Sequence, residues 1–200
     1  MIQEITSSRE RLLDAAERIF SAKGFAATTL RDISSDLGLS HASLYYHFPG
    51  GKEELFAAVT ERNILRHGAG LLHCIEAACS DLREQLRGAA AWLLSQSPMD
   101  LIRMAGSDMP ALPEAVAKKL MDLVYVQMIL RLRQVFQSGV DSGELGPTTD
   151  AGLMAGAFLG LIESLHSIPE FAVRRSRTDM ANELVEVLLK GLDYSKGGLK

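Results

Sequence analysis

Apolar residues in this chain recur at intervals of three and four, the spacing that places them on one face of an α-helix. The first such segment covers residues 7–25. Its apolar face consists of Leu12, Ala15, Ala16, Ile19 and Phe20. Ser7 and Glu10 have the S-x-x-E spacing of a capping box, and Gly24 is a typical residue just beyond a helix end. The pattern therefore predicts an amphipathic helix that starts at Ser7 and stops at Gly24.

Two shorter helices follow with almost no linker between them. Thr29 is placed to cap the first and Gly38 to close it, and Ser40 is placed to cap the second. Two short helices joined by a turn of three or four residues that contains glycine form a helix-turn-helix. An ordinary helical hairpin has the same kind of turn, so this spacing alone leaves both interpretations open.

The remaining sequence keeps the helical period and shows no long alternation of apolar and polar residues. We expect breaks at clusters of glycine, serine and proline, including one at Gly68 and Gly70. The predicted helices cover residues 52–67 with an uneven continuation to about 79, 81–95, 98–106, 114–138, 149–167 and 177–190. The fold class is therefore predicted to be all-α, with about nine helices and a frayed tail at 194–200.

Composition excludes a membrane-spanning or secreted class. Hydrophobic residues make up 47% of the 200 residues, which is enough for a packed core. The longest apolar run, residues 151–162, contains 12 residues and is too short to cross a bilayer. The first residues are polar and acidic where a secretory signal would be apolar. We expect a cytoplasmic protein with no membrane partner.

Known catalytic and metal-binding patterns do not occur. The chain has two cysteines, too few for a disulfide framework or a tetrahedral metal set. Cys74 and Cys79 would point about 140° apart on a helix, so we interpret them as small buried or half-buried side chains, with a redox switch as the alternative. Neither H-E-x-x-H nor G-x-S-x-G is found. We expect no catalysis, no metal and no cofactor.

The helix that begins near Ser40 carries side chains suited to reading DNA. In a helix-turn-helix the second helix lies in the major groove, with its first residues against base edges. His41 and Ser43 would form hydrogen bonds with bases there, and Ala42 would contact a thymine methyl group. Ser40 lies at the same end of the helix.

Tyr45 and Tyr46 suit the DNA backbone instead. A phenol is long and stiff, and its hydroxyl can donate to a phosphate oxygen; roughly half or more of protein–DNA hydrogen bonds go to the backbone. His47, Lys52 and Thr29 would add donors, the last two at helix starts that also favour phosphate. As an alternative, the two tyrosines are core aromatics under a loop, although adjacent helical positions face about 100° apart and at least one should reach the surface.

The charge balance argues against indiscriminate binding to nucleic acid. The net charge is −4 overall, and residues 1–66 contain 8 basic and 9 acidic residues. Affinity for DNA would therefore depend on placed donors, helix starts and a dimeric footprint rather than on bulk positive charge.

Small residues in the last third of the chain indicate a close helix contact. Gly152, Gly156 and Gly160 recur every four positions, which lets another helix approach. Together with Leu184 and Leu188 of the last helix, they would form a four-helix bundle with a second copy of the chain. The alternative is that this small face packs only inside one chain.

Methionine and aromatic residues in the middle of the chain indicate a ligand pocket. Methionine adapts to irregular guests, and small-molecule sites are mostly apolar with a few polar groups. The candidate pocket residues are Trp92, Arg103, Met104, Tyr125, Gln127, Met128, Phe158, Glu163 and His166. A plain core stripe is the alternative, as is an exposed pair formed by Glu163 and His166.

Residues 9–59 together resemble the DNA-binding domain of the TetR (tetracycline repressor) family of bacterial regulators. The matching residues, besides the amphipathic first helix, are Gly24-Phe25, Thr28-Thr29, Ile33, Leu37-Gly38-Leu39-Ser40, Leu44-Tyr45-Tyr46-His47-Phe48 and Lys52-Glu53-Glu54-Leu55. Between Phe48 and Lys52 the chain has one residue more than the commoner spacing of the family.

This resemblance implies an all-helical homodimer. It implies a helix-turn-helix DNA-binding domain over residues 1–51 and an effector-binding and dimerisation domain over residues 52–193. It also implies a repressor that binds a palindromic operator in double-stranded DNA and releases it when a small, largely apolar effector binds. An activator, or a regulator controlled by a protein partner, is the alternative.

Overall fold

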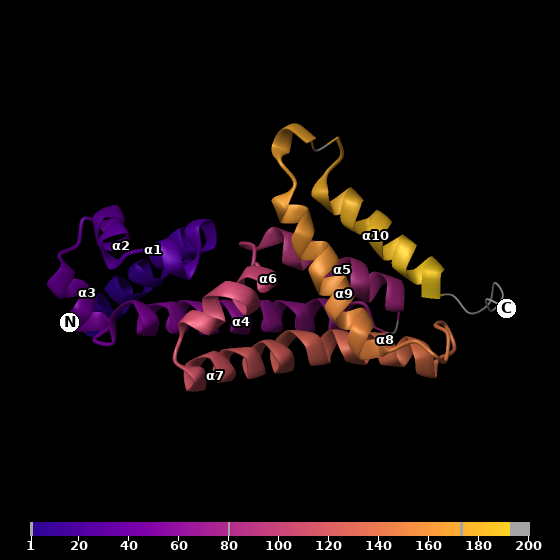
Figure 1. Ribbon diagram of the computed structural model, residues 1–200. Coiled ribbons are helices and arrows are strands. Elements are labelled where there is room, and N and C mark those ends of the chain that lie inside the picture. The colour runs from indigo at the N-terminus through magenta and orange to yellow at the C-terminus, as the bar shows by residue number, and fades with distance from the viewer. Residues whose placement is uncertain (1, 80, 173, 193–200) are drawn as a thin grey trace. The chain divides into compact units, whose positions relative to one another are not determined.

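The computed structural model of the chain describes residues 2–79, 81–172 and 174–192. Over these residues the protein is helical and contains no strand, which confirms the predicted all-α class (Figure 1). The α-helices are α1 (Ile2–Ala27), α2 (Leu30–Leu37), α3 (His41–His47), α4 (Gly51–Ala77), α5 (Leu82–Ser95), α6 (Leu101–Arg103), α7 (Glu114–Val124), α8 (Leu130–Asp141), α9 (Ala151–Ser164) and α10 (Arg177–Leu192). Short π and 3₁₀ segments are η1 (Met104–Asp108), η2 (Met109–Ala111), η3 (Tyr125–Ile129), η4 (Leu165–Ser167) and η5 (Glu170–Ala172). The tail predicted at 194–200 lies outside the described residues.

The first helix differs from its predicted start. Because α1 begins at Ile2, Ser7 lies inside the helix, and the predicted capping box does not start it. Gly24 has φ 77° and ψ 173°, so the helical path is broken there as expected, and a short helical turn then continues to Ala27. Glycine adopts this left-handed φ without the steric cost that a side chain would add.

The predicted break at Gly68 and Gly70 is wrong, because α4 runs without interruption through both residues. A Cβ atom on Gly70 would lie 1.8 Å from Cε2 of Trp92, and one on Gly68 would lie 2.6 Å from Oε1 of Gln127. The two glycines therefore allow α5 and η3 to pack closely on α4 instead of ending the helix.

Packing divides the chain into two compact units. The first consists of Met1–Ile64 with Met99–Leu123, and the second of Leu65–Pro98 with Val124–Lys200. Helix α4 contributes to both units. The predicted domains, 1–51 and 52–193, describe a division of function, and that assignment stays a prediction.

In the first unit α1, α2 and α3 enclose an apolar core together with the start of α4. Phe56 of α4 lies between two rings of the α1 end, with ring centroids 5.0 Å from Phe20 and 5.0 Å from Phe25. Leu44 of α3 is completely buried, and Phe48, which follows α3, is 1% exposed. These side chains hold α3 against the rest of the unit.

A charged contact joins α6 and η1 to this core. Arg103 donates from its Nη atoms to the backbone carbonyls of Ser21 at 3.1 Å and Phe20 at 3.3 Å. Asp108 is 4% exposed and accepts a hydrogen bond from the backbone N–H of Phe25 at 3.0 Å. Its other oxygen lies 3.4 Å from Nε of Arg103. The pair thus satisfies backbone groups that the kink in α1 leaves without helical partners.

In the second unit α5 and α9 each contact both α8 and α10. Phe136 of α8 and Phe158 of α9 are completely buried, with ring centroids 6.3 Å apart. Asp81 and Asp150 cap the starts of α5 and α9 by accepting backbone N–H groups of the first turn. In the described part of the chain no helix combines the length and the apolar character needed to cross a membrane.

Candidate nucleic-acid interface

Local hydrogen bonds fix where α2 and α3 begin. Thr29 Oγ1 accepts the N–H of Asp32 at 3.1 Å, while the Asp32 carboxylate accepts the N–H of Thr29 at 2.9 Å. The backbone and hydroxyl hydrogen bonds from Thr29 lower the pKa of Asp32. Gly38 ends α2 with φ 64°, and Ser40 Oγ accepts the N–H of Ser43 at 3.2 Å at the start of α3. The turn and both caps therefore set the direction of α3.

Thr29 and Ser40 thus have a structural role as capping residues. Both residues are exposed, but each hydroxyl already accepts a hydrogen bond from its own helix. Contact of either residue with DNA stays a prediction.

The front of α3 is open to solvent at the positions expected to read bases. His41 and Ala42 are exposed and Ser43 is half-buried, while Leu44 faces the core. A seven-residue helix with one buried apolar anchor therefore presents its first turn outward.

Both tyrosines of α3 lie at the surface. Tyr45 is 48% exposed and Tyr46 is 71% exposed, so neither is a core aromatic. The ring of Tyr46 lies edge-on to that of His47, with centroids 5.3 Å apart. Two phenol hydroxyls and an imidazole are therefore available at the outer face of the second helix of the helix-turn-helix.

Lys52 has a partner inside the protein. Its ammonium donates to the backbone carbonyl of Phe25 at 3.0 Å and lies 4.2 Å from the centroid of the Phe25 ring. It thereby fastens the start of α4 to the end of α1. Gly51, with φ 71°, and Gly50, whose N–H donates to Glu54 at 2.7 Å, accommodate the additional residue before Lys52. A phosphate contact by Lys52 stays a prediction.

Much of the acidic charge of the first unit is paired. Arg62 of α4 contacts the carboxylates of Glu10, Asp14 and Glu17 of α1 at 3.0, 2.8 and 2.9 Å. Arg18 pairs with Asp36 at 2.7 Å. Each ion pair also uses a basic side chain, so pairing leaves the net charge of the unit unchanged, and affinity for DNA depends on placed donors.

One cation of the helix-turn-helix was missed by the sequence analysis. Arg31 is exposed in the first turn of α2 and forms no ion pair with the described residues. A basic residue beside the cap residue Thr29 was the available signal, since phosphates bind at helix starts. Arg31 joins the candidate phosphate contacts.

Comparison with known proteins agrees with this geometry. The sequence profile described as "Bacterial regulatory proteins, tetR family" matches residues 12–59. The chain is 43% identical over 82 residues to the HTH-type transcriptional regulator LmrA of Bacillus subtilis, a match that covers 40% of this chain and 42% of LmrA. Residues 12–59 are a DNA-binding domain of the TetR family.

One further relative and one solved structure show how far the similarity extends. IcaR of Staphylococcus epidermidis, a negative transcriptional regulator of a biofilm operon, is 42% identical over 53 residues, 26% of this chain and 28% of IcaR. The chain thus spans less than half the length of the curated relatives LmrA and IcaR. A Saccharomonospora viridis protein solved in complex with choline shares the fold, with a TM-score of 0.71 over 92% of this chain and 96% of that chain at 20% identity.

The nine pocket candidates do not lie in one unit. Arg103 and Met104 belong to the first unit, where Arg103 binds carbonyls of α1. A pocket built within the second unit therefore does not include them. This placement was not predictable from local patterns, because the contact joins residues about eighty positions apart.

The other seven candidates lie in the second unit and differ in exposure. Met128 and Phe158 are completely buried, and Glu163 is 8% exposed, which excludes an exposed pair with His166. Trp92, Gln127 and His166 are half-buried and Tyr125 is exposed. Burial lowers the pKa of His166, and a hydrogen bond with the Leu93 carbonyl offsets part of this effect. Their predicted contact with a ligand stays a prediction.

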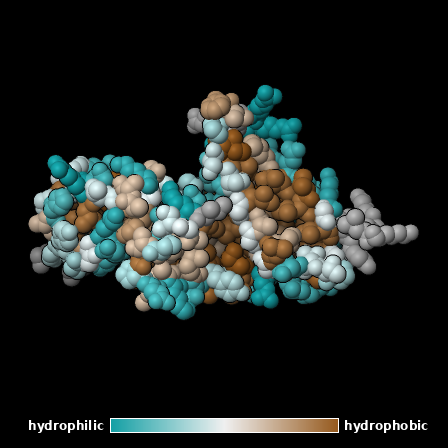
Figure 2. Space-filling model, viewed as in Figure 1, coloured by the Kyte–Doolittle hydropathy of each residue, from teal (hydrophilic) through white to brown (hydrophobic). Residues whose placement is uncertain are grey.

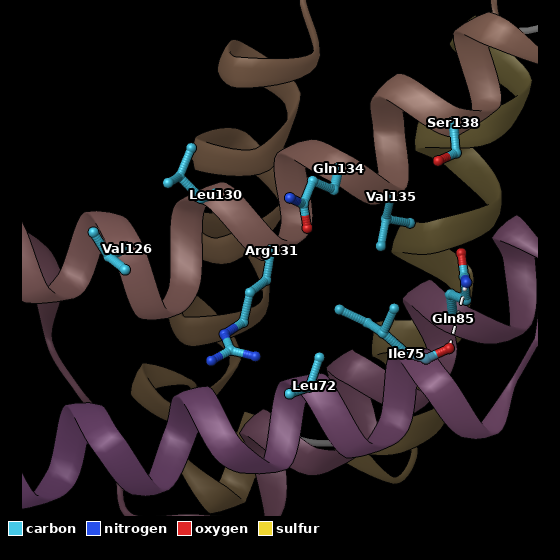
Figure 3. A pocket seen from close by; sticks show the side chains of 9 residues that line it. All are labelled: Leu72, Ile75, Gln85, Val126, Leu130, Arg131, Gln134, Val135 and Ser138. Carbon is cyan, nitrogen blue, oxygen red and sulfur yellow. Dashed lines mark hydrogen bonds between the residues drawn. The ribbon is translucent and has the colours of Figure 1, made fainter.

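The second unit contains a cavity of about 330 Å³ beside α8 (Figure 3). Its lining residues come from α4, α5, η3 and α8, and are Leu72, Ile75, Gln85, Val126, Leu130, Arg131, Gln134, Val135 and Ser138. None of the nine predicted residues lines it. Methionine and aromatic content indicated core positions and not the cavity. The position of a cavity depends on how helices cross, and hydrophobic periodicity does not specify this.

The predicted dimer face is open in the single chain. A Cβ atom on Gly156 or Gly160 would meet no atom within 4 Å, so these positions do not pack inside the described chain. Leu153 of α9 and Val187 of α10 are 64% and 62% exposed. Figure 2 shows hydrophobic residues gathered over α9 and the adjoining part of α10. The predicted interface residues Gly152, Leu184 and Leu188 are half-buried on the same two helices.

Proposed function

We propose that the protein is a ligand-responsive repressor of transcription that binds a palindromic operator as a homodimer. Helix α3 enters the major groove, His41, Ala42 and Ser43 contact base edges, and Tyr45 and Tyr46 donate to phosphates. A small effector bound by the second unit releases the operator.

The exposure of both tyrosines on a capped α3 carries this proposal. Aromatic side chains normally add to the core, and here two adjacent ones lie at the surface while Leu44 and Phe48 provide the burial. Their hydroxyls are uncharged donors, which suits a unit whose sequence has no excess of positive charge.

Homodimerisation is supported by the open glycine face of α9. Leu153 of α9 and Val187 of α10 are exposed, and the glycines of α9 allow close helix approach. A two-fold dimer places two α3 helices on successive half-sites, which lie about 34–36 Å apart on DNA. The repressor assignment is supported by the similarity to IcaR, which is a negative regulator.

Release of the operator follows from a population shift. An effector that binds more tightly to a dimer with wrongly spaced α3 helices draws the protein toward that state. The spacing of half-sites is fixed by the DNA, so a few ångströms of change between the two α3 helices remove most of the affinity.

A mobility-shift assay on the DNA that flanks the protein's own gene tests this function. The protein is expected to retard this DNA far more strongly than a scrambled duplex of equal length and composition, and a set of small apolar compounds is expected to contain one that abolishes retardation. Equal retardation of both duplexes would contradict the proposal. In transcription in vitro, a rise rather than a fall in transcript on adding the protein would identify an activator.

A further inference from the structure

The cavity beside α8 combines apolar walls with one cation. Leu72 and Ile75 of α4 lie opposite Leu130 and Val135 of α8 (Figure 3). The side chain of Arg131 extends from α8 toward α4 into the space between them (Figure 3). The lining includes no acidic residue.

Arg131 has no anionic partner within the described part of the chain. Its Nη2 donates to Oε1 of Gln127 at 2.7 Å, and its Nε is buried without a hydrogen-bond partner among the described residues. Arg87 of the same unit, by contrast, pairs with Glu84 and Glu186. A half-buried guanidinium that donates to a neutral amide retains donors for an anion.

The position of this guanidinium is set by a tight helix contact. A Cβ atom on Gly68 would lie 2.6 Å from Oε1 and 2.8 Å from Cβ of Gln127, so the glutamine packs directly on the glycine. Gln127 in turn lies one helical turn before Arg131 and accepts its hydrogen bond. The packing of Gln127 on Gly68 therefore positions the amide oxygen that accepts the hydrogen bond of Arg131.

The other end of the cavity is polar but uncharged. The amide nitrogen of Gln85 donates to the carbonyls of Ile75 at 3.3 Å and Cys79 at 2.5 Å. Ser138 lies near it on α8 (Figure 3). The Gln85 amide and the Ser138 hydroxyl are neutral hydrogen-bonding groups, so they add no charge to the cavity.

We propose that this cavity binds a small carboxylate with an apolar body. The carboxylate pairs with Arg131, and the hydrocarbon part lies against Leu72, Ile75, Leu130 and Val135. One guanidinium matches one carboxylate in geometry and charge, whereas a doubly charged phosphate would leave charge uncompensated. The volume of about 330 Å³ suits a molecule of the size of a medium-chain fatty acid. This inference rests on the proposed function, of which it names the effector class.

Calorimetric titration of the full-length protein with octanoate tests the inference, with octanol and octylamine as probes of equal chain length. Octanoate is expected to bind at least about tenfold more tightly than either probe, because only the carboxylate pairs with the guanidinium. In Arg131→Gln that preference is expected to disappear. Arg133→Gln is the matched control, since Arg133 is exposed on the same helix and does not line the cavity. Equal binding of octanoate and octanol, or unchanged binding by Arg131→Gln, would overturn the inference.

A second variant guards against misfolding of Arg131→Gln. Leu72 is 39% exposed at the edge of the cavity, so Leu72→Trp fills the space without disturbing the core. It is expected to lose octanoate binding while melting like the parent protein, and retained octanoate binding would count against this site.

The titration contains no DNA, so its outcome is separate from the operator assay. Absence of an octanoate preference in the parent protein overturns the ligand class and leaves operator binding untouched. Octanoate binding that depends on Arg131 supports the site even where no operator is retarded.

Discussion

Replacing Tyr45 and Tyr46 together with phenylalanine is expected to weaken operator binding by at least about thirtyfold without changing the preferred sequence. A neutral hydrogen bond contributes about 0.5–1.5 kcal/mol, which is a lower bound for a bond to an ionised phosphate, and a dimer loses four such bonds. Both hydroxyls lie at the surface, so their removal leaves the core of the first unit intact. Affinity is measured by fluorescence anisotropy at one fixed salt concentration, since phosphate contacts make binding depend on salt.

Tyr125→Phe is the matched control for this pair. Tyr125 is 48% exposed, the same fraction as Tyr45, but it lies in η3 of the second unit. Its replacement is expected to leave operator affinity unchanged. If the double variant bound the operator as tightly as the parent protein, the tyrosines would not contact phosphates. If its preferred base sequence changed, the tyrosines would contact bases instead.

Asp108→Ala is expected to lower the free energy of unfolding by about 2–3 kcal/mol, because it leaves the buried N–H of Phe25 without an acceptor. It also leaves Arg103 without its carboxylate, although Arg103 is 31% exposed and keeps its two carbonyl partners. Removing one member of a fully buried ion pair costs about 3–5 kcal/mol of stability. Because Arg103 is partly exposed, the expected loss for Asp108→Ala is smaller than this. Urea denaturation followed by circular dichroism measures the change.

Asp122→Ala provides the comparison within the same unit. Asp122 pairs with Lys118 at 2.6 Å one helical turn away, and both side chains are exposed. Such surface pairs contribute about 0–1 kcal/mol. A change for Asp108→Ala as small as that for Asp122→Ala would show that the contact between η1 and α1 adds little to stability.

The sequence specified the helix-turn-helix because its signals are local. Thr29 and Ser40 cap the helices, and Gly38 closes the first, each through bonds to residues within four positions. Helical spacing predicted that at least one of the two tyrosines reaches the surface, and the structure exposes both.

Features that depend on distant contacts were not predictable in the same way. Gly68 and Gly70 suggest a helix break in the sequence, but their role depends on Gln127 and Trp92, which lie far along the chain. From the sequence, Arg103 was a candidate for a polar pocket residue, whereas in the structure it donates to backbone carbonyls of α1. Hydrophobic periodicity specifies which face of a helix is buried and not which helix covers it.

The ligand cavity shows the same limit. Methionine and aromatic content predicted a pocket, but Met128 and Phe158 are core residues. Arg131 lies in a helix with other charged residues, and nothing in its neighbourhood distinguishes it from Arg133. Only the packing of α8 beside α4 places one of these arginines in a cavity.

Selection of binding sites from a random duplex library, done in parallel with the parent protein and His41→Ala, tests most directly whether α3 reads bases. The account predicts that both proteins select a palindrome, and that His41→Ala loses or changes the preference at one position in each half-site. Selection of the same sequence with the same preferences and affinity by both proteins would contradict the placement of the front of α3 in the major groove.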